Sequence, residues 1–455
     1  MPNPNGDVSG RARIERAGPM DRTVLATDRG PVPMNIGAIL EFDPSPGPDL
    51  STVSTLLAER IPRIPRLRQR LRRVPFGCGH PVWVDDPGFA LEHHLTEQDW
   101  PAPAGERQLF DLAAEFVCTP LSRDRPLWQA RLVSDRSSGR TALIVVLHHV
   151  LADGLGGLAV LAALTDSGPR LAGPVFPQPP PSRRALAADA ARAQVAAVRA
   201  LPVAMRRGFA GLRELGLGRT RPRLVEPTSL NRPTSSRRRV TRVTVPLAEV
   251  TSLAHGHHGT VNDVVVAAVT GAVLAVLRAR GERPGRLVVS VPISGRRGTT
   301  ADRLGNVTGV RPVSVPAIAD DEDRLTRFVA ATSAAPGHDP ERASSGGPLG
   351  LAFRALSRLG MFQLFIDHQR MVHTFVTNLR GPAEPVELAG FRVRSLVPLV
   401  VTPGNVGVTF AVLSYAGDLG ITLVADPAIV PEQDELATQV AGTVARLRRR
   451  AASPH

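Results

Sequence analysis

The segment TALIVVLHH, residues 141–149, constrains the fold of this chain more than any other stretch. Its apolar residues, several of them β-branched, continue without a polar interruption until two histidines, which is typical of a strand buried within a sheet. Helical patterns flank this strand at 106–118 and from 158 onward. Strand-like and helical segments then mix through the rest of the chain. The sequence therefore predicts an α/β architecture with two halves.

The chain has 455 residues, more than one hydrophobic core usually supports, so we expect two domains. Dense proline in SGPRLAGPVFPQPPPSR, residues 167–183, marks the end of the first. We expect an N-terminal lobe over 1–170, a proline-rich linker with an Arg/Ala-rich helical segment over 171–235, and a C-terminal lobe over 236–455. Strands of the second lobe are predicted at 286–293, 307–315, 373–377, 391–401, 406–415 and 419–424.

Three further features bound the class of protein. Residues 50–73 are expected to form a helix interrupted by proline, with a basic face. No run of 18 apolar residues occurs, so no transmembrane helix is predicted, and the N-terminus lacks the apolar segment of a secretory signal. Cys78 and Cys118 make neither a disulfide framework nor a metal motif. We therefore expect a cytoplasmic protein.

The net charge of +14 and the isoelectric point near 11.3 call for an anionic partner or another explanation. The chain has no lysine, so all 55 basic residues are arginine. Nucleic acid is not predicted, because aromatic residues are only 4% and no stacking platform or zinc module is evident. An anionic lipid surface and an anionic cofactor fit the charge equally well. The basic helical segment 184–215 is expected to be a solvated linker helix, with docking on a membrane surface as the alternative.

The chain contains three His-His pairs, and the pair in HHVLADG has the strongest chemical context. His149 and Asp153 stand four positions apart, so a helical turn between them would bring them close together. Gly154 would permit the backbone angles of a sharp turn. Histidine titrates near neutral pH and can take a proton from a hydroxyl group. This segment is therefore the candidate catalytic centre.

The other two pairs lack this context. The pair at 93–94 has no carboxylate or glycine at a matching spacing, so we expect strand-end residues without a catalytic role. The loop HGHHG at 255–259 has no nearby carboxylate or cysteine other than Asp263 to complete a ligand set. No metal site is predicted.

The HHxxxDG pattern at 148–154 resembles the active-site signature of the superfamily that contains chloramphenicol acetyltransferase, peptide-synthetase condensation domains and plant acyl-CoA-dependent acyltransferases. Further stretches resemble one branch of it, the bacterial wax ester synthase/diacylglycerol acyltransferases. In chain order these stretches are PMNIGAILEFD (33–43), PRLRQRLRR with PVWVDD (65–86), PLW (126–128), SLNRP with RRR (229–239), TVNDVVVAAVTGAV (260–273), VPISGRR (291–297), LGNVTG (304–309), TNLRGP (377–382) and SYAGDLGI (414–421). The resemblance extends over roughly residues 20 to 445.

The resemblance implies two chloramphenicol-acetyltransferase-like lobes, each a mixed sheet with helices, and an active site at the lobe interface. It also implies transfer of a fatty acyl group from acyl-CoA to a hydroxyl of diacylglycerol or of a long-chain alcohol. Acyl-CoA is then a co-substrate, no cofactor stays bound, and an anionic membrane or lipid-droplet surface is a plausible partner. No serine or cysteine stands in a nucleophile-elbow pattern, in agreement with direct transfer.

The same resemblance assigns roles within the motif. His149 matches the catalytic histidine and would be the general base, while His148 would pack or orient. Asp153 would be structural, and Arg296 of VPISGRR, or its neighbour Arg297, matches an arginine that pairs with this aspartate in related folds. Such a pair would hold the loop by a charge-assisted hydrogen bond.

Two further motifs each allow a functional and a structural interpretation. Asn262 and Asp263 match the family's Asn-Asp pair and would support the active site, but either side chain could equally cap a helix that starts near 263. Pro126, Leu127 and Trp128 would pack near the acyl tunnel or belong to an ordinary core. The groups that stabilise the oxyanion are not assignable from the sequence.

Two competing functions remain. A condensation-type acyltransferase of secondary metabolism would take its acyl group from a carrier protein, but the chain carries no neighbouring carrier or adenylation domain. A non-catalytic homologue would bind lipid or a partner protein, but the intact HHVLADG argues against it. The sequence therefore favours the lipid O-acyltransferase.

Overall fold

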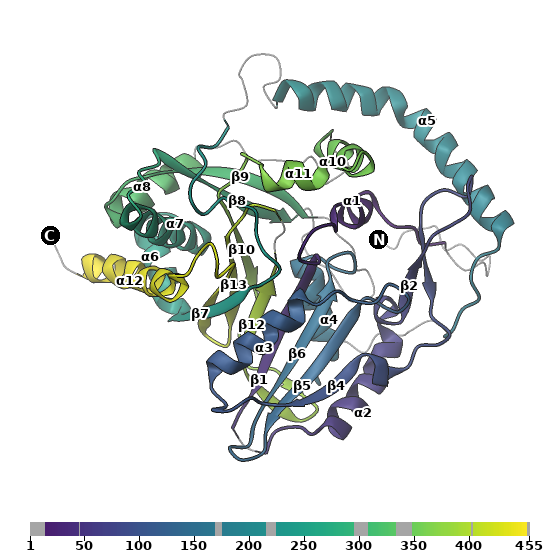
Figure 1. Ribbon diagram of the computed structural model, residues 1–455, viewed down its shortest axis with the longest axis horizontal. Coiled ribbons are helices and arrows are strands. Elements are labelled where there is room, and N and C mark those ends of the chain that lie inside the picture. The colour runs from purple at the N-terminus through teal and green to yellow at the C-terminus, as the bar shows by residue number, and fades with distance from the viewer. Residues whose placement is uncertain are drawn as a thin grey trace, which may run out of the picture.

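Two six-stranded mixed sheets with flanking helices form the molecule (Figure 1). The computed structural model describes residues 14–44, 46–168, 175–214, 224–294, 308–333, 348–401 and 404–452. The first sheet has the order β11-β12-β1-β6-β5-β4 and the second the order β7-β14-β13-β10-β8-β9. A small antiparallel pair, β2-β3, stands apart. The expectation of an α/β fold in two lobes is confirmed.

The strands of the first sheet, in spatial order, are β11 (Glu387–Leu388), β12 (Phe391–Val400), β1 (Asn35–Phe42), β6 (Arg140–His148), β5 (Trp128–Asp135) and β4 (Leu95–Asp99). Its helices are α2 (Leu50–Arg60), α3 (Glu106–Cys118) and α4 (Gly154–Leu164). The strands of the second sheet, in spatial order, are β7 (Arg239–Pro246), β14 (Asp418–Ala425), β13 (Val408–Tyr415), β10 (Thr374–Arg380), β8 (Arg286–Ser294) and β9 (Thr308–Pro316). Its helices are α6 (Leu247–Gly256), α7 (Val261–Ala279), α8 (Asp321–Ser333) and α12 (Gln433–Ala452).

The remaining elements are α1 (Pro19–Thr27), α5 (Arg183–Glu214), α10 (Pro348–Arg358), α11 (Phe362–Asp367), the strands β2 (Gln69–Arg72) and β3 (Val82–Asp85), and the short 3-10 turns Ile61–Arg63, Pro65–Leu67 and Leu91–His93.

Strand β6 is buried on both faces, which explains its unbroken apolar sequence. Leu143, Val145 and Leu147 pack in the core under α2 and α4. The alternate residues Ala142, Ile144 and Val146 pack in the core under α3. Because successive side chains of a strand point to opposite faces, only a strand covered on both sides tolerates such a run.

The expected helix over 50–73 is only partly correct. Helix α2 ends at Arg60, and the chain continues in two 3-10 turns, one with Pro62 as its second residue and one that begins at Pro65. Proline cannot supply the backbone N–H that a continuing helix needs. Residues 69–72 form strand β2, so the basic stretch at the end of this segment is extended.

The second half of the chain also builds the first lobe. Strands β11 and β12 belong to the first sheet, where β12 pairs antiparallel with β1. The strand at 391–400 was expected within a C-terminal lobe, but the chain crosses over to the first sheet there before β13 returns to the second. This crossover ties the two lobes together through backbone hydrogen bonds.

Helix α7 is long and apolar enough to cross a membrane by length and composition, but 78% of it is buried inside the protein. It is the central helix of the second lobe, packed against α6, α8 and α12. Its composition therefore reflects core packing, as in many proteins without a membrane-spanning segment.

Candidate active site

The two histidines of HHVLADG lie where β6 ends, and the neighbouring strands hold their backbone from both sides. The N–H of His148 donates to the carbonyl of Leu127, just before β5, at 2.9 Å. The N–H of His149 donates to the carbonyl of Met34, just before β1, at 2.8 Å. A further bond from the Leu151 N–H to the His148 carbonyl, at 2.9 Å, closes the turn. The position of the histidine pair is therefore fixed by three strands of the sheet.

The side chain of His148 is buried and both of its ring nitrogens are bound within the protein. Nδ1 accepts a hydrogen bond from the Val150 N–H at 3.0 Å. A nitrogen that accepts carries no proton, so Nε2 holds the ring proton and donates it to Asp28 Oδ2 at 3.1 Å. These contacts fix the orientation of the His148 ring. They leave neither nitrogen for a substrate proton.

Asp28, the residue that ends α1, binds both the ring of His148 and the backbone of Met34. Its Oδ1 accepts the Met34 N–H at 3.0 Å, and Oδ2 also contacts the guanidinium of Arg123. Burial alone would raise the pKa of Asp28, but the hydrogen bond from His148, with the Met34 N–H and the charge of Arg123, lowers the pKa to about 2. Asp28 was not predicted as a site residue. No local pattern shows that a residue 120 positions away is its partner.

His149 differs from His148 in its surroundings. It is only partly buried, whereas His148 is 3% exposed. Its backbone is anchored through Met34, the same residue whose N–H binds Asp28. Of the two histidines, His149 is thus the more exposed.

Asp153 caps helix α4. Its backbone is extended, with φ −80° and ψ −176°, and its side chain accepts the Gly156 N–H at 3.0 Å. Residues 149–151 form a turn and Asp153 is extended, so no continuous helical turn joins His149 to Asp153. The cap satisfies one of the free N–H groups at the start of α4.

Gly154 is required for space rather than for its backbone angles. It is the first residue of α4 and does not adopt a positive φ, so the turn makes no use of the backbone freedom of glycine. A Cβ at this position would lie 3.1 Å from Cδ1 of Leu379, a residue of β10 in the second sheet. The DG turn thus abuts the other lobe, and the expected location of the site at the lobe interface is supported by this contact.

Asn262 and Asp263 lie in the first turn of α7, not at its cap. The helix begins at Val261, and Thr260 is the cap: its hydroxyl accepts the Asp263 N–H while Asp263 Oδ2 accepts the Thr260 N–H at 2.8 Å. This reciprocal pair is a capping box. The expected cap by Asn262 or Asp263 is therefore wrong in detail, although Asp263 does contribute to capping. Asp263 also accepts a hydrogen bond from Thr332 of α8, a contact within the second lobe.

Arg296, the expected partner of Asp153, and its neighbour Arg297 lie outside the described residues. The same holds for most of LGNVTG. The pairing of Asp153 with Arg296 stays a prediction.

Pro126, Leu127 and Trp128 are all buried beside the histidine pair. The Trp128 indole N–H donates to the Leu67 carbonyl at 2.6 Å. Trp128 also borders a narrow apolar cavity between α2, β5, β6 and α4, together with Leu147 and Val160. The motif thus supports the core and, through the Leu127 carbonyl, the backbone of His148. Its role beside an acyl tunnel stays a prediction.

His94, of the pair at 93–94, has a structural role. His94 is 3% exposed, stacks on Trp128 at 4.5 Å between ring centroids, and donates from Nδ1 to the Trp128 carbonyl at 2.8 Å. Burial lowers the pKa of His94 against the opposing effect of that carbonyl. Among the described residues, no three His, Cys, Asp or Glu side chains are grouped as metal ligands would be.

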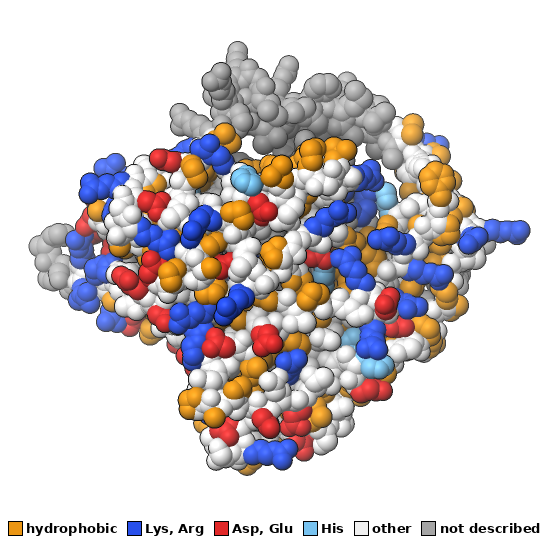
Figure 2. Space-filling model, viewed as in Figure 1, with side chains coloured by type: hydrophobic (Ala, Val, Ile, Leu, Met, Phe, Trp, Pro, Cys, Tyr) orange, Lys and Arg blue, Asp and Glu red, His pale blue; other side chains and the backbone are white. Residues whose placement is uncertain are grey.

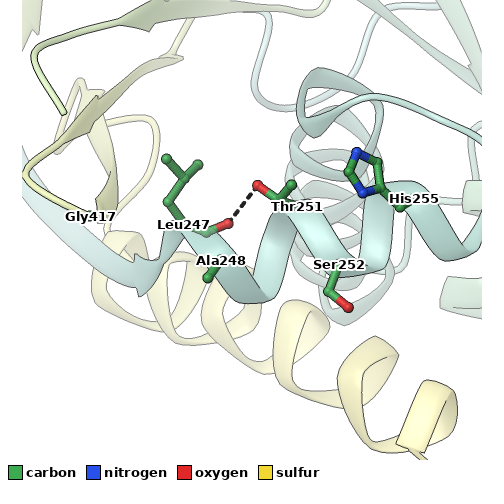
Figure 3. Close-up of a pocket in the computed structure, with 6 residues that line it drawn as sticks. All are labelled: Leu247, Ala248, Thr251, Ser252, His255 and Gly417. Atoms are coloured by element: carbon green, nitrogen blue, oxygen red, sulfur yellow. Dashed lines mark hydrogen bonds between the residues drawn. The ribbon is translucent and has the colours of Figure 1, made fainter.

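A shallow hollow over α6 does not belong to this site. It is bordered by Leu247, Thr251, Ser252 and His255 of α6 and by Gly417 (Figure 3). The Thr251 hydroxyl donates to the Leu247 carbonyl at 2.9 Å within the helix. These groups lie in the second lobe on a helix that carries none of the predicted catalytic residues.

Comparison with known proteins supports the family resemblance that the sequence motifs indicated. A model described as the wax ester synthase/diacylglycerol acyltransferase catalytic domain matches residues 18–265, and a model of the C-terminal domain of the same family matches residues 305–448. The probable diacylglycerol O-acyltransferase tgs1 of Mycobacterium tuberculosis is 32% identical over 434 residues, covering 91% of this chain and 91% of that protein. A putative diacylglycerol O-acyltransferase of the same organism is 31% identical over 456 residues, covering 93% of this chain and 94% of the relative.

Solved structures share the fold. The wax ester synthase/diacylglycerol acyltransferase from Marinobacter aquaeolei VT8 superposes with a TM-score of 0.70 at 19% identity, covering 96% of this chain and 100% of that one. A starter condensation domain of rhizomide synthetase, solved in complex with C8-CoA, gives a TM-score of 0.62 at 16% identity, covering 97% and 95%. The two-lobed architecture implied by the HHxxxDG resemblance is confirmed.

Proposed function

Because the chain belongs to the wax ester synthase/diacylglycerol acyltransferase family and is an O-acyltransferase, we propose that His149 is its general base, acyl-CoA its donor, and diacylglycerol or a long-chain alcohol its acceptor. The observation that carries this proposal is the contrast between the two histidines. His148 has both ring nitrogens bound within the protein, while His149 is partly exposed beside the lobe interface.

In the proposed reaction His149 removes the proton of the acceptor hydroxyl as its oxygen attacks the thioester carbonyl. The new C–O bond forms, the C–S bond breaks, and the imidazolium returns the proton to the departing CoA thiolate. General base catalysis contributes roughly 10²–10⁴-fold to such a rate. The remainder is assigned to positioning of both substrates and to donors aimed at the oxyanion.

The other residues of the motif support this base without transferring protons. His148 orients the turn through Asp28 and Val150. Asp153 and Gly154 set the start of α4 against β10. In this proposal Arg296 pairs with Asp153 and no cofactor or metal takes part.

The test is a substrate panel with the purified protein. Palmitoyl-CoA is supplied with diolein or with hexadecanol, and both the ester and free CoA are measured. We expect triacylglycerol or wax ester in equal amount to the CoA released. His149→Ala should abolish ester formation with a melting temperature within a few degrees of the wild type. His93→Ala, which changes an exposed histidine of another pair, should keep full activity, and activity retained in His149→Ala would refute the base assignment.

A carrier-protein donor is the second candidate, because condensation domains share the fold. The same panel separates the two, with palmitoyl carrier protein replacing palmitoyl-CoA. Ester formed only from the carrier-bound donor would favour the condensation-type reaction. Release of CoA without any ester would count against the lipid acceptor.

We also propose that the protein works at an anionic membrane or lipid-droplet surface. The acceptors named above are water-insoluble lipids, and the net charge of +14 would attract anionic head groups. Helix α5 contains the basic segment that is expected to be a linker helix, with membrane docking as the alternative. Its first turns pack on β3 through Leu186, and Ala190 is buried, while Val195 and Val198 further along are exposed.

A further inference from the structure

An exposed apolar patch covers the turn between α10 and α11 and its surroundings. The large apolar side chains that the described chain leaves exposed number nine, and five of them gather here. We call these five the α10–α11 patch: Leu224 (58% exposed), Leu359 (68%), Met361 (45%), Leu364 (66%) and Met371 (37%). Leu224 joins the others because Val225 and Arg370 exchange hydrogen bonds. Exposed apolar side chains that gather in one part of the surface are a candidate interaction site.

Aromatic side chains pack between the two helices that carry the patch. Phe353 of α10 contacts Phe362 and Phe365 of α11, with ring centroids 5.6 and 5.5 Å apart. The aromatic rings of this hairpin therefore pack inward, and its leucines and methionines remain outside. Figure 2 shows orange side chains grouped in this region, with blue side chains next to them.

Arginines adjoin the patch where α10 packs on α1. We call Arg22, Arg354 and Arg358 the arginine cluster. Burial lowers the pKa of Arg22, and the nearby charges of Arg354 and Arg358 lower it further, against a smaller opposing effect of Asp21. The Arg22 Nη1 contacts a ring nitrogen of His80 at 2.7 Å, and the Arg22 Nε is buried without a hydrogen-bond partner.

Within the part of the chain that the structure describes, Asp21 is the carboxylate that offsets the charge of Arg22, and its effect is the smallest of those acting on Arg22. Arg354 donates to uncharged groups, the Thr23 hydroxyl at 2.8 Å and the Pro19 carbonyl at 3.2 Å. On α11 the carboxylate of Asp367 accepts from the Gln363 amide at 2.9 Å. Arginines that repel one another at a surface bind phosphate groups well, because the guanidinium is planar, permanently charged and weakly hydrated.

We propose that the α10–α11 patch and the arginine cluster form one docking surface for an anionic phospholipid bilayer. Leu359, Met361 and Leu364 would enter the boundary between head groups and acyl chains, and the arginines would bind lipid phosphates. This combination of an apolar face with a cationic border is the usual composition of interfacial membrane helices. The inference rests on the proposed function for its purpose, which is to bring a water-insoluble acceptor to the enzyme.

The docking surface is connected to the candidate active site through one helix. Helix α1 packs against α10 and is bound to it by Arg354. The same helix ends at Asp28, which holds His148 and the Met34 N–H. An acceptor taken from the bilayer would therefore enter beside the helix that positions the histidine turn.

Co-sedimentation of the full chain with vesicles tests the inference without any substrate. Vesicles of phosphatidylcholine alone are compared with vesicles containing phosphatidylglycerol. We expect tighter binding to the anionic vesicles, weakened by salt. The double variant Leu359→Ser/Leu364→Ser should weaken binding to both compositions by about ten-fold or more. Arg358→Gln should lose about five-fold in affinity for the anionic vesicles only, the effect of one basic residue near such a surface.

Matched controls lie elsewhere on the surface. Phe76→Ser removes another fully exposed apolar side chain, and Arg136→Gln removes an exposed arginine of the β5-β6 turn. Both should bind vesicles as the wild type does. Wild-type binding by Leu359→Ser/Leu364→Ser, an equal loss in Phe76→Ser, or no vesicle binding by the wild type would overturn the inference. All of these substitutions are at exposed positions, and unchanged melting temperatures would show that each variant is folded.

Activity in detergent separates this inference from the proposed function. A protein that esterifies detergent-dispersed diolein but does not bind vesicles keeps the proposed function and loses the docking surface. A protein that binds vesicles through Leu359 and Leu364 but forms no ester keeps the docking surface and loses the proposed function.

Discussion

Two adjacent histidines at the end of β6 have different environments, and a single carboxylate accounts for much of the difference. Asp28 fixes the tautomer of His148 and at the same time binds the N–H of Met34, whose carbonyl holds the backbone of His149. The carboxylate therefore acts on both histidines, on one through its ring and on the other through its backbone. A residue outside the recognised motif thus controls the geometry of the motif.

Asp28→Asn should lower kcat about ten-fold while KM changes little. The amide loses the charge that favours the Nε2–H of His148, and the resulting misplacement of the turn costs rate more than binding. Initial rates with palmitoyl-CoA and diolein measure this. Asp111→Asn, which breaks an exposed ion pair with Arg107 on α3, is the control and should behave as wild type. An unchanged kcat in Asp28→Asn would show that His148 needs no charged partner.

The same carboxylate should make stability depend on acid pH. Its folded pKa of about 2 is below the ordinary value of 3.8, so the stabilisation is complete above about pH 4 and is lost as the pH falls through 2. At neutral pH the shift corresponds to about 2 kcal/mol. Urea unfolding should therefore show Asp28→Asn less stable than wild type at pH 7, with the difference narrowing between pH 4 and pH 2. A constant difference across this range would contradict the assignment.

In the motif at the start of α7, Asp263 takes part in capping the helix, whereas its neighbour Asn262 does not. Thr260 and Asp263 form the capping box, and Asn262 between them is only partly buried. Capping therefore explains Thr260 and Asp263 but gives no structural reason for Asn262. Its role at the active site stays a prediction.

Thr260→Ala should lower the free energy of unfolding by about 1 kcal/mol, the usual loss for an N-cap side chain. Asn262→Ala should change stability by less than about 0.5 kcal/mol, because its side chain takes no part in the capping box. Chemical denaturation gives both values. If Asn262→Ala also lowers activity at unchanged stability, the residue supports the site, and equal destabilisation by the two variants would contradict the assignment of the cap.

The elements of the fold could largely be predicted because apolar patterns are local. The predicted strand at 286–293 is β8 (Arg286–Ser294), and the predicted helix at 106–118 is α3. The pairing partners of the strands could not be predicted. The sequence of β12 carries no signal that distinguishes it from the other strands, yet it pairs with β1, some 350 residues away. Gly154 shows the same limit within the site: its local sequence suggested a turn, but Leu379 of the other lobe determines why glycine is needed.

For the molecule as a whole, the arrangement of the two lobes depends on a few charged groups as well as on β12. Glu41 of β1 is 3% exposed and lies 3.3 Å from Arg242 of β7 in the second sheet and 3.0 Å from Arg394 of β12. Arg242 also pairs with Glu106, which is 48% exposed. The buried carboxylate therefore joins the two sheets, whereas Glu106 joins them at the surface.

Glu41→Gln should lower the free energy of unfolding by about 2 kcal/mol, because it removes the charge of a buried carboxylate that accepts a hydrogen bond from Arg394. Glu106→Gln, acting on Arg242 from a solvated position, should cost less than about 1 kcal/mol. Urea unfolding of both variants measures the contrast. Since His149 lies on one sheet and Leu379 on the other, Glu41→Gln should also lower kcat, and Glu106→Gln should not. Equal effects of the two substitutions would mean that the crossover through β12, and not the buried charge, sets the relative position of the lobes.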